Sequence, residues 1–247
     1  MGENKEILSI IPARGGSKGL PGKNIKPLLG KPLILWTVEE AKKSKYINRI
    51  ILSTDNMEIV QACKDRRVEI PFLRPKELSR DDTPVIDVIL HLLEYLRSTE
   101  GYLPDFVVLL QPTSPLRTCE DIDNVCDMLT ANNEANAVIS MTAVSQMPYW
   151  MRVINNNDGY VEYFISHNYK DCRRQDLPAI YIVNGAIYMC KTDILMKSKT
   201  FSPEKTLGYL MPKCRSIDID DIVDFKLVES ILFDQDNREK DENFIGG

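Results

Sequence analysis

The sequence predicts an α/β fold of three layers, in which helices cover both faces of a mostly parallel sheet. Short apolar runs typical of buried strands alternate with amphipathic segments of helical period. The connections between them are short, and this rhythm indicates parallel strands joined by right-handed crossovers. A chain of 247 residues with 43% hydrophobic content can bury one sizeable core, so we expect a single domain over residues 1–247.

Composition and charge narrow the class of protein. A net charge of −5 argues against nucleic acid as the main partner. No apolar run approaches membrane-spanning length, and the first residues lack a hydrophobic signal region, so we expect a cytoplasmic protein without a membrane partner. The six cysteines contain no CxxC pair and the two histidines have no zinc spacing, which favours free thiols in a reducing compartment over a disulfide framework.

A glycine-rich loop follows the first predicted strand, residues 7–11. Its glycines let the backbone approach a bulky anion and turn N–H groups toward it, while Arg14, Lys18 and Lys23 supply positive charge. Residues 7–38 include five basic residues and no acidic one, although the whole chain is acidic. This positive island predicts an anionic ligand, such as a phosphate group, bound at one site.

The loop matches neither of the two commonest phosphate-binding fingerprints. The Walker A spacing fails because Ser17 stands five residues before Gly22 and Asn24 follows the lysine. The dinucleotide pattern fails because the glycines at 16, 19 and 22 are three residues apart. A flexible basic surface loop is the alternative interpretation, against which stand the preceding strand and the lack of acidic residues.

Strand and helix patterns alternate through the middle of the chain. The patterns predict, in order, a helix from residue 32, a strand closing on a polar turn at 49–55, a helix to about 67, a short strand at 68–73, a helix from 84, a strand at 106–110, a helix from 118, a strand at 137–141 and a helix at 223–233. Thr83 and Thr118 are the expected N-caps of two of these helices, because their hydroxyls can accept a free amide hydrogen.

A second polar turn, residues 111–117, follows the most uniformly apolar strand. A strand without polar positions is covered on both faces and is therefore central. Ligands of open α/β sheets bind beyond the carboxyl ends of strands, where both this turn and the glycine loop lie. Gln111, directly at the end of the strand, is the preferred functional residue of the turn.

An aromatic-rich segment interrupts the alternation. Six of the nineteen aromatic residues fall between residues 149 and 169, around a turn at 155–159 that is typical of a β-hairpin. Large aromatic side chains are enriched at subunit interfaces, so we expect residues 145–180 to form an arm that packs against a second copy in a homodimer. A hairpin folded back on its own domain is the alternative.

Two acidic residues near the end of the chain complete the candidate site. In an extended strand Asp218 and Asp220 share one face, while Ile217 and Ile219 face the core. Their Cα atoms are then about 7 Å apart, and both carboxylates can bind one Mg²⁺ that also holds triphosphate oxygens. A solvated acidic edge leading into a helix, with Asp220 or Asp221 as its N-cap, is the alternative.

Several stretches together resemble the signatures of the N-acylneuraminate cytidylyltransferases, also called CMP-sialic acid synthetases. The matching stretches are residues 11–24, 110–117, 174–181 and 184–188. The resemblance implies a Rossmann-like nucleotidyltransferase sheet with a β-hairpin dimerisation arm near the neighbour's site. It also implies a Mg²⁺-dependent reaction in which a nine-carbon keto sugar acid attacks the α-phosphate of CTP and releases pyrophosphate.

The resemblance and the chemistry of the residues assign roles by position. The expected nucleotide-binding residues are Ala13, Arg14, Gly15, Lys18, Lys23, Asn24, Arg74 and Thr83. The expected sugar-binding residues are Gln111, Arg174, Asn184 and Tyr188, with Arg173 open as a substitute for its neighbour. Metal binding is expected at Asp218 and Asp220, and these two residues with Arg14 and Lys23 are the expected catalytic residues.

Three alternative functions stay open. A cytidylyltransferase for the eight-carbon acid Kdo shares the implied fold, but its loop normally continues with proline where this chain has Asn24. A sugar-1-phosphate nucleotidyltransferase would use another NTP, and a non-catalytic module would bind CTP without releasing pyrophosphate. Pro84 and Val85 stand where the family often has serines, which leaves the ribose contacts open. N-acetylneuraminate, legionaminate and pseudaminate are the candidate acceptors.

Overall fold

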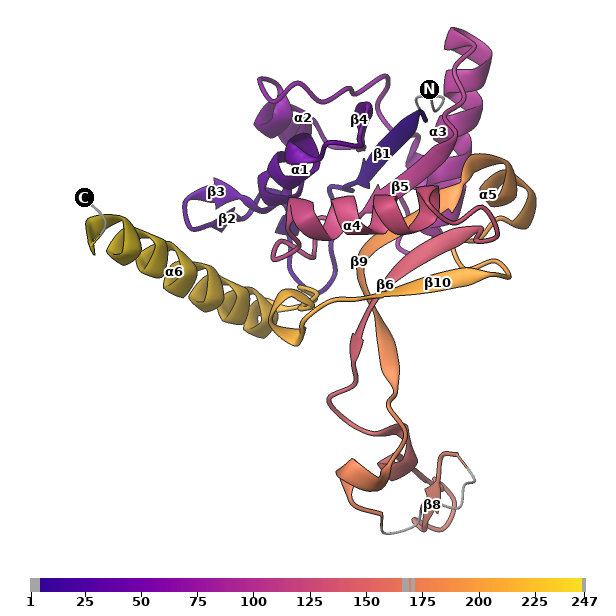
Figure 1. Cartoon of the computed structure of the whole chain (residues 1–247), viewed down its shortest axis with the longest axis vertical. Helices are drawn as coiled ribbons and strands as arrows, with labels where there is room; N and C mark the ends of the chain where they lie inside the picture. The colour runs from indigo at the N-terminus through magenta and orange to yellow at the C-terminus, as the bar shows by residue number, and fades with distance from the viewer. Residues whose placement is uncertain (1–4, 166–168, 170–171, 246–247) are drawn as a thin grey trace.

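A six-stranded sheet organises the computed structural model, which describes residues 5–165, 169 and 172–245 (Figure 1). The strands are β1 (Ile7–Pro12), β4 (Arg49–Ser53), β5 (Phe106–Leu110), β6 (Ala137–Ala143), β9 (Tyr181–Lys191) and β10 (Thr206–Leu210). Their order in the sheet is β10-β6-β9-β5-β1-β4. β1 is parallel to β4 and β5, and β10 is parallel to β6, whereas β9 is antiparallel to both of its neighbours. The predicted mostly parallel sheet is confirmed.

Helices cover both faces of this sheet, as predicted. One face packs against α1 (Leu33–Lys43), α2 (Met57–Cys63) and α4 (Cys119–Thr130). The other packs against α3 (Val85–Glu100) and α5 (Thr192–Ser198). Successive strand residues point to opposite faces, so Ile7 and Ile11 belong to the first core while Leu8 and Ile10 belong to the second. Among the described residues, no helix is long and apolar enough to cross a membrane.

A third, smaller apolar cluster joins the start of α6 (Ile222–Ile245) to the glycine loop. Phe225 and Val228 of α6 pack with Leu20, Ile219 and Leu28, the last from the short hairpin of β2 (Pro27–Leu28) and β3 (Lys31–Pro32). The rest of α6 extends away from the sheet (Figure 1). The predicted helix is therefore longer than residues 223–233, and its first turns fix the position of the acidic segment that precedes it.

Four local predictions differ from the structure. The strand expected at 68–73 is only a single bridge between Ile51 and Glu69, and α2 ends at Cys63. Thr83 is not an N-cap: Pro84 holds that position, and the Thr83 hydroxyl donates to the carbonyl of Glu77. Residues 216–220 form no strand, because the Ile219 amide donates to the carbonyl of Thr113 in the turn after β5 instead of to another strand. The cap at Thr118 is confirmed, with a full capping box.

The aromatic segment stands away from the sheet as an arm between β6 and β9 (Figure 1). It contains the antiparallel pair β7 (Arg152–Ile154) and β8 (Val161–Tyr163), so the predicted hairpin is confirmed. Apolar side chains on it are exposed, including Tyr160 at 72%, Ile154 at 66% and Phe164 at 61%. The hairpin therefore does not fold back on its own domain.

Candidate active site

The glycine loop is built to pack closely against the segment that precedes α6. A Cβ atom added to Gly19 would lie 2.3 Å from the carbonyl oxygen of Asp220, so only glycine fits there. Inside the loop, the Asn24 side chain donates to the carbonyl of Arg14 at 2.9 Å and holds the curve of the backbone. The loop after the first strand and the acidic segment near the last helix therefore meet.

Lys23 contacts the acidic segment, residues 218–220, at this meeting point. Its Nζ donates to the carbonyl of Ile219 at 2.5 Å and lies 3.9 Å from Oδ1 of Asp220. Asp218 is half-buried, and its Oδ1 is buried without a hydrogen-bond partner in the described chain. Burial raises the pKa of Asp218 and the nearby charge of Asp220 adds to the rise, although the Thr113 hydroxyl and the charge of Lys23 act in the opposite direction. A cation would satisfy both the buried oxygen and the paired negative charge.

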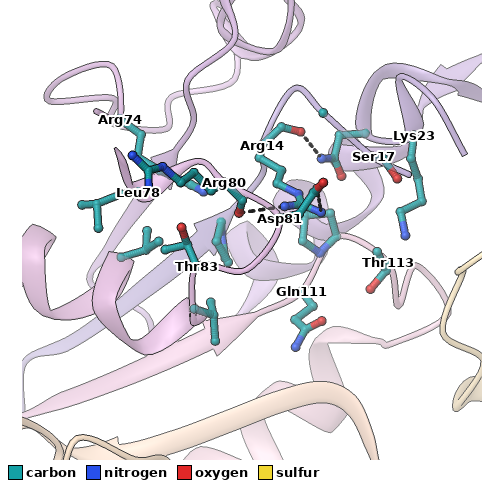
Figure 2. Close-up of a pocket in the computed structure, with 16 residues that line it drawn as sticks. Arg14, Ser17, Lys23, Arg74, Leu78, Arg80, Asp81, Thr83, Gln111 and Thr113 are labelled. Atoms are coloured by element: carbon teal, nitrogen blue, oxygen red, sulfur yellow. Dashed lines mark hydrogen bonds and ion pairs between the residues drawn. The ribbon is translucent and has the colours of Figure 1, made fainter. Parts of the chain in front are cut away.

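A cavity of about 260 Å³ opens beside Lys23 (Figure 2). Its lining comes from the glycine loop, the loop before α3 and the turn after β5. The residues predicted to bind nucleotide that line it are Arg14, Lys23, Asn24, Arg74 and Thr83. Arg74 is buried against β4, where its guanidinium donates to Ser53, and burial lowers its pKa to about 10.

An acidic side chain already binds two of the predicted phosphate-binding cations. Asp81 lies 2.9 Å from the guanidinium of Arg14 and 2.9 Å from Nζ of Lys18. Arg14 also donates to the carbonyl of Arg80 at 2.9 Å (Figure 2). These contacts tie the loop before α3 across the mouth of the glycine loop. Sequence reasoning missed Asp81, because no local pattern shows which distant cation an exposed acid will meet.

Three predicted nucleotide-binding residues lie outside the described cavity lining. Ala13 is buried, and its amide donates to the carbonyl of Ser53 at 2.9 Å. The Gly15 amide donates to Asp55 at 2.9 Å, so this N–H group is already used within the protein. Lys18 is the exposed partner of Asp81. The glycine loop thus presents fewer free groups toward the cavity than its composition predicts.

A second cavity, of about 250 Å³, shares Gln111 and Val85 with the first. Tyr188 of β9 lines it, together with Phe201. A Cβ atom added to Gly185 would lie 3.4 Å from Oδ2 of Asp218 and 3.9 Å from Oε1 of Gln111. Gln111 therefore stands between the two cavities and close to the acidic segment, where two substrates could be brought together.

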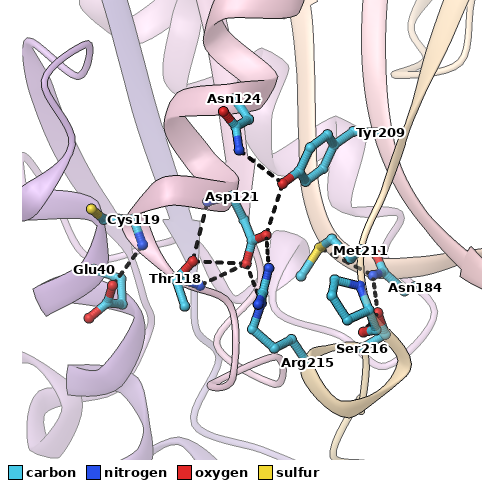
Figure 3. Close-up of polar contacts among 11 residues, drawn as sticks. Glu40, Thr118, Cys119, Asp121, Asn124, Asn184, Tyr209, Met211, Arg215 and Ser216 are labelled. Carbon is cyan, nitrogen blue, oxygen red and sulfur yellow. Dashed lines mark hydrogen bonds and ion pairs between the residues drawn. The ribbon is translucent and has the colours of Figure 1, made fainter.

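Two predicted sugar-binding residues, Asn184 and Arg174, lie outside the lining of both cavities. Asn184 is 6% exposed, and its side chain accepts from the Ser140 hydroxyl at 2.6 Å and donates to the Ser216 hydroxyl at 2.9 Å (Figure 3). It holds the protein together and lines neither described cavity. Arg174 lies on the arm and donates to the carbonyl of Val144 at 2.8 Å, while Arg173 pairs with Asp176. Neither arginine lines either of the two described cavities.

Arg117 is a positioning residue that its sequence context did not reveal. It is 1% exposed and donates to the carbonyls of Ala186 at 2.8 Å and Gln111 at 3.2 Å. Burial lowers its pKa to about 10. Because it joins the end of β5 to β9, it fixes the backbone on both sides of the second cavity.

An open α/β sheet with a cationic loop and paired carboxylates beyond its strand ends has the architecture of a nucleotide-binding enzyme. The family model described as "Cytidylyltransferase" matches residues 8–233, and the chain belongs to this cytidylyltransferase family.

Relatives with assigned names cover nearly the whole chain. A CMP-N,N'-diacetyllegionaminic acid synthase of Legionella pneumophila is 34% identical over 227 residues, which is 92% of this chain and 96% of that protein. An N-acylneuraminate cytidylyltransferase of Streptococcus agalactiae is 33% identical over 95% of this chain, which spans only 55% of that longer protein. The chain also aligns with the solved structure of a CMP:2-keto-3-deoxy-manno-octonic acid synthetase complexed with CTP, over 93% of this chain and 99% of that one. The TM-score of 0.69 shows a shared fold, and the sequence identity is 16%.

Proposed function

We propose that this cytidylyltransferase makes a CMP-sugar from CTP and a nine-carbon keto sugar acid of the N-acetylneuraminate, legionaminate or pseudaminate type. The anomeric hydroxyl of the acid would lose its proton to a carboxylate or to solvent and form a bond to the α-phosphorus of CTP, and the bond to pyrophosphate would break. One observation carries the proposal: Lys23 meets the Asp218–Asp220 segment at the edge of a cationic cavity that adjoins a second cavity.

The reaction requires alignment of two anions and neutralisation of the charge on the leaving group. In the proposal, Arg14 and Lys23 hold the triphosphate, Lys18 assists, and Arg74 and Thr83 contact the base and ribose. Asp218 and Asp220 would hold Mg²⁺, for which carboxylate donors and the unpaired buried oxygen of Asp218 are suited. The metal would supply positive charge against the repulsion between nucleotide and acid.

The acceptor would bind in the second cavity, beside Gln111 and Tyr188. Its carboxylate requires a guanidinium or a comparable donor. The described residues lining this cavity include Lys199 but no arginine. We therefore propose that Arg174 of a second copy completes the site, carried there by the arm. We also propose a cytoplasmic location, consistent with the free cysteines.

Pyrophosphate release tests the proposed reaction. Each of the four NTPs would be crossed with N-acetylneuraminate, legionaminate, pseudaminate, Kdo and a hexose 1-phosphate in a coupled assay. We expect release only with CTP and a nine-carbon acid. Release with the hexose 1-phosphate and another NTP, or CTP binding without any release, would replace the proposal with one of its alternatives.

Replacing Asp81 with asparagine is expected to lower the CTP concentration for half-maximal rate by about two- to fivefold. The carboxylate of Asp81 competes with the triphosphate for Arg14 and Lys18, and the amide carries no charge. Steady-state kinetics at constant ionic strength measures the change. Asp82→Asn, at the exposed neighbouring position, is the control. An unchanged or higher half-saturation for Asp81→Asn would contradict the competition.

The exposed apolar arm supports a homodimer, because an arm that contacts little of its own domain needs another surface to cover it. The double variant Ile154→Asp/Phe164→Asp is expected to be monomeric in analytical ultracentrifugation at micromolar concentration and to lose activity through the missing Arg174. Leu103→Asp, also at an exposed apolar position but outside the arm, should leave the assembly intact. A variant that stays dimeric, or a monomer with full activity, would disprove the proposed arm contact.

A further inference from the structure

We propose that the ion pair between Asp121 and Arg215 is a positioning device that holds the carboxylates of Asp218 and Asp220 in place for metal binding. The inference rests on the proposed function, which gives those two residues a metal to bind. Figure 3 shows the pair at the junction of α4, β10 and the segment before α6.

Asp121 has more partners than a helix cap requires. Its carboxylate accepts from Arg215 at 3.0 and 2.8 Å, from the Tyr209 hydroxyl at 3.0 Å, and from the amide and hydroxyl of Thr118. The side chain is fully buried. Burial alone would raise the pKa of Asp121, but the hydrogen bonds from Arg215, Thr118 and Tyr209 outweigh it and the pKa ends below its usual value. The pair is therefore ionised at neutral pH.

The segment that carries the two carboxylates has few backbone anchors of its own. Between Met211 and Ile219, the backbone hydrogen bonds inside the segment are those of the local turns, in which the amides of Arg215 and Ser216 donate. At its two ends, the Met211 amide donates to the carbonyl of Met141 in β6, and the Ile219 amide donates to the carbonyl of Thr113 in the turn after β5. The path between these two points is therefore set mainly by side chains.

Two adjacent side chains supply that constraint. Arg215 reaches Asp121 of α4, and the Ser216 hydroxyl accepts from Asn184 of β9. Asn184 is in turn bound to Ser140 of β6. These anchors lie two and three residues before Asp218, so they fix the direction in which the chain approaches Lys23.

Such a constraint is needed because burial and mutual repulsion disfavour the positions that the two carboxylates occupy. Asp218 is half-buried with an unpaired oxygen, and the negative charge of Asp220 is near. A free segment would move outward and let water solvate both groups. Groups that orient metal ligands from outside typically change metal affinity by about 10- to 100-fold when removed.

The experiment compares Arg215→Gln with Arg49→Gln. Arg49 forms a similar two-contact pair with Glu69, at 2.9 and 2.5 Å, on β4 at the opposite edge of the sheet. Both variants should melt at a lower temperature than the wild type. Amide hydrogen exchange of residues 216–220 and the affinity for Mn²⁺, measured by electron paramagnetic resonance with CTP present, separate positioning from stability alone.

We expect Arg215→Gln to accelerate exchange in residues 216–220 and to weaken Mn²⁺ binding about tenfold, with Arg49→Gln changing neither. Should Arg215→Gln fail to fold, Tyr209→Phe removes one partner of Asp121 and should shift both readouts in the same direction to a smaller extent. Protected amides, or Mn²⁺ affinity within twofold of wild type, would overturn the positioning role. A wild-type protein that binds no Mn²⁺ with CTP would overturn the metal assignment, while the exchange result would still decide whether the pair holds the segment.

Discussion

Replacing Lys23 with alanine is expected to slow CMP-sugar formation at least ~10²-fold, because in the proposed reaction its ammonium group stabilises charge on the departing pyrophosphate. The Lys23 side chain is 12% exposed and lines the first cavity, where water cannot easily replace it. Single-turnover rates at saturating CTP measure the effect on the chemical step and separate it from weaker nucleotide binding.

Lys26→Ala is the matched control for this prediction. Lys26 belongs to the same positive island, but its Nζ lies 5.5 Å from the centre of the Phe225 ring and it does not line the described cavity. It should retain a rate near that of the wild type. Ordinary turnover by Lys23→Ala would remove the glycine loop from the mechanism, whereas an equal loss in both variants would indicate a general charge effect.

Asp218→Asn is expected to have two opposite effects. Activity should fall to near background and lose its response to Mg²⁺, because the neutral amide is a poor metal ligand. Thermal stability should rise in the absence of ligands, because the substitution removes a half-buried carboxylate with an unpaired oxygen. Mg²⁺ titration of the rate and a thermal melt of the same sample measure the two effects.

Asp221→Ala provides the contrast. Asp221 caps α6 by accepting from the amides of Val223 at 2.7 Å and Asp224 at 3.1 Å. Its loss should lower stability by about 1 kcal/mol and leave the Mg²⁺ response largely intact. An Asp218→Asn variant that is less stable than wild type and still responds to Mg²⁺ would show that this carboxylate has a structural role instead.

Features that depend on one contiguous segment could be predicted from the sequence. The buried strand 106–110 and Gln111 at its end follow from an unbroken apolar run and the first polar residue after it. The glycine loop could be recognised as an anion-binding candidate because basic residues and conformationally free glycines lie together in one short stretch. Such patterns depend on local conformation and burial, which a single segment reveals.

Features that depend on distant partners could not be predicted in the same way. The alternation of isoleucine and aspartate at 217–220 has the period of a strand, yet only a neighbouring strand makes it one, and none of the described strands pairs with it. The Asn184 side chain could hydrogen-bond a sugar, but in the structure it is hydrogen-bonded to the hydroxyls of Ser140 and Ser216. The sequence shows which hydrogen-bonding groups a residue carries, whereas their partners depend on the fold.

The antiparallel strand β9 has one further consequence. It begins where the arm ends, but its pairing with β6 is interrupted at residues 184–187, where Gly185 has a φ of 77°, before Tyr188 lines the second cavity. The residues next to the arm, 181–183, pair with β6 alone, whereas residues 188–190 pair with both β5 and β6. A displacement of the arm would therefore be absorbed at Gly185, beside Asp218 and Gln111, and would alter these side chains before it reached Tyr188.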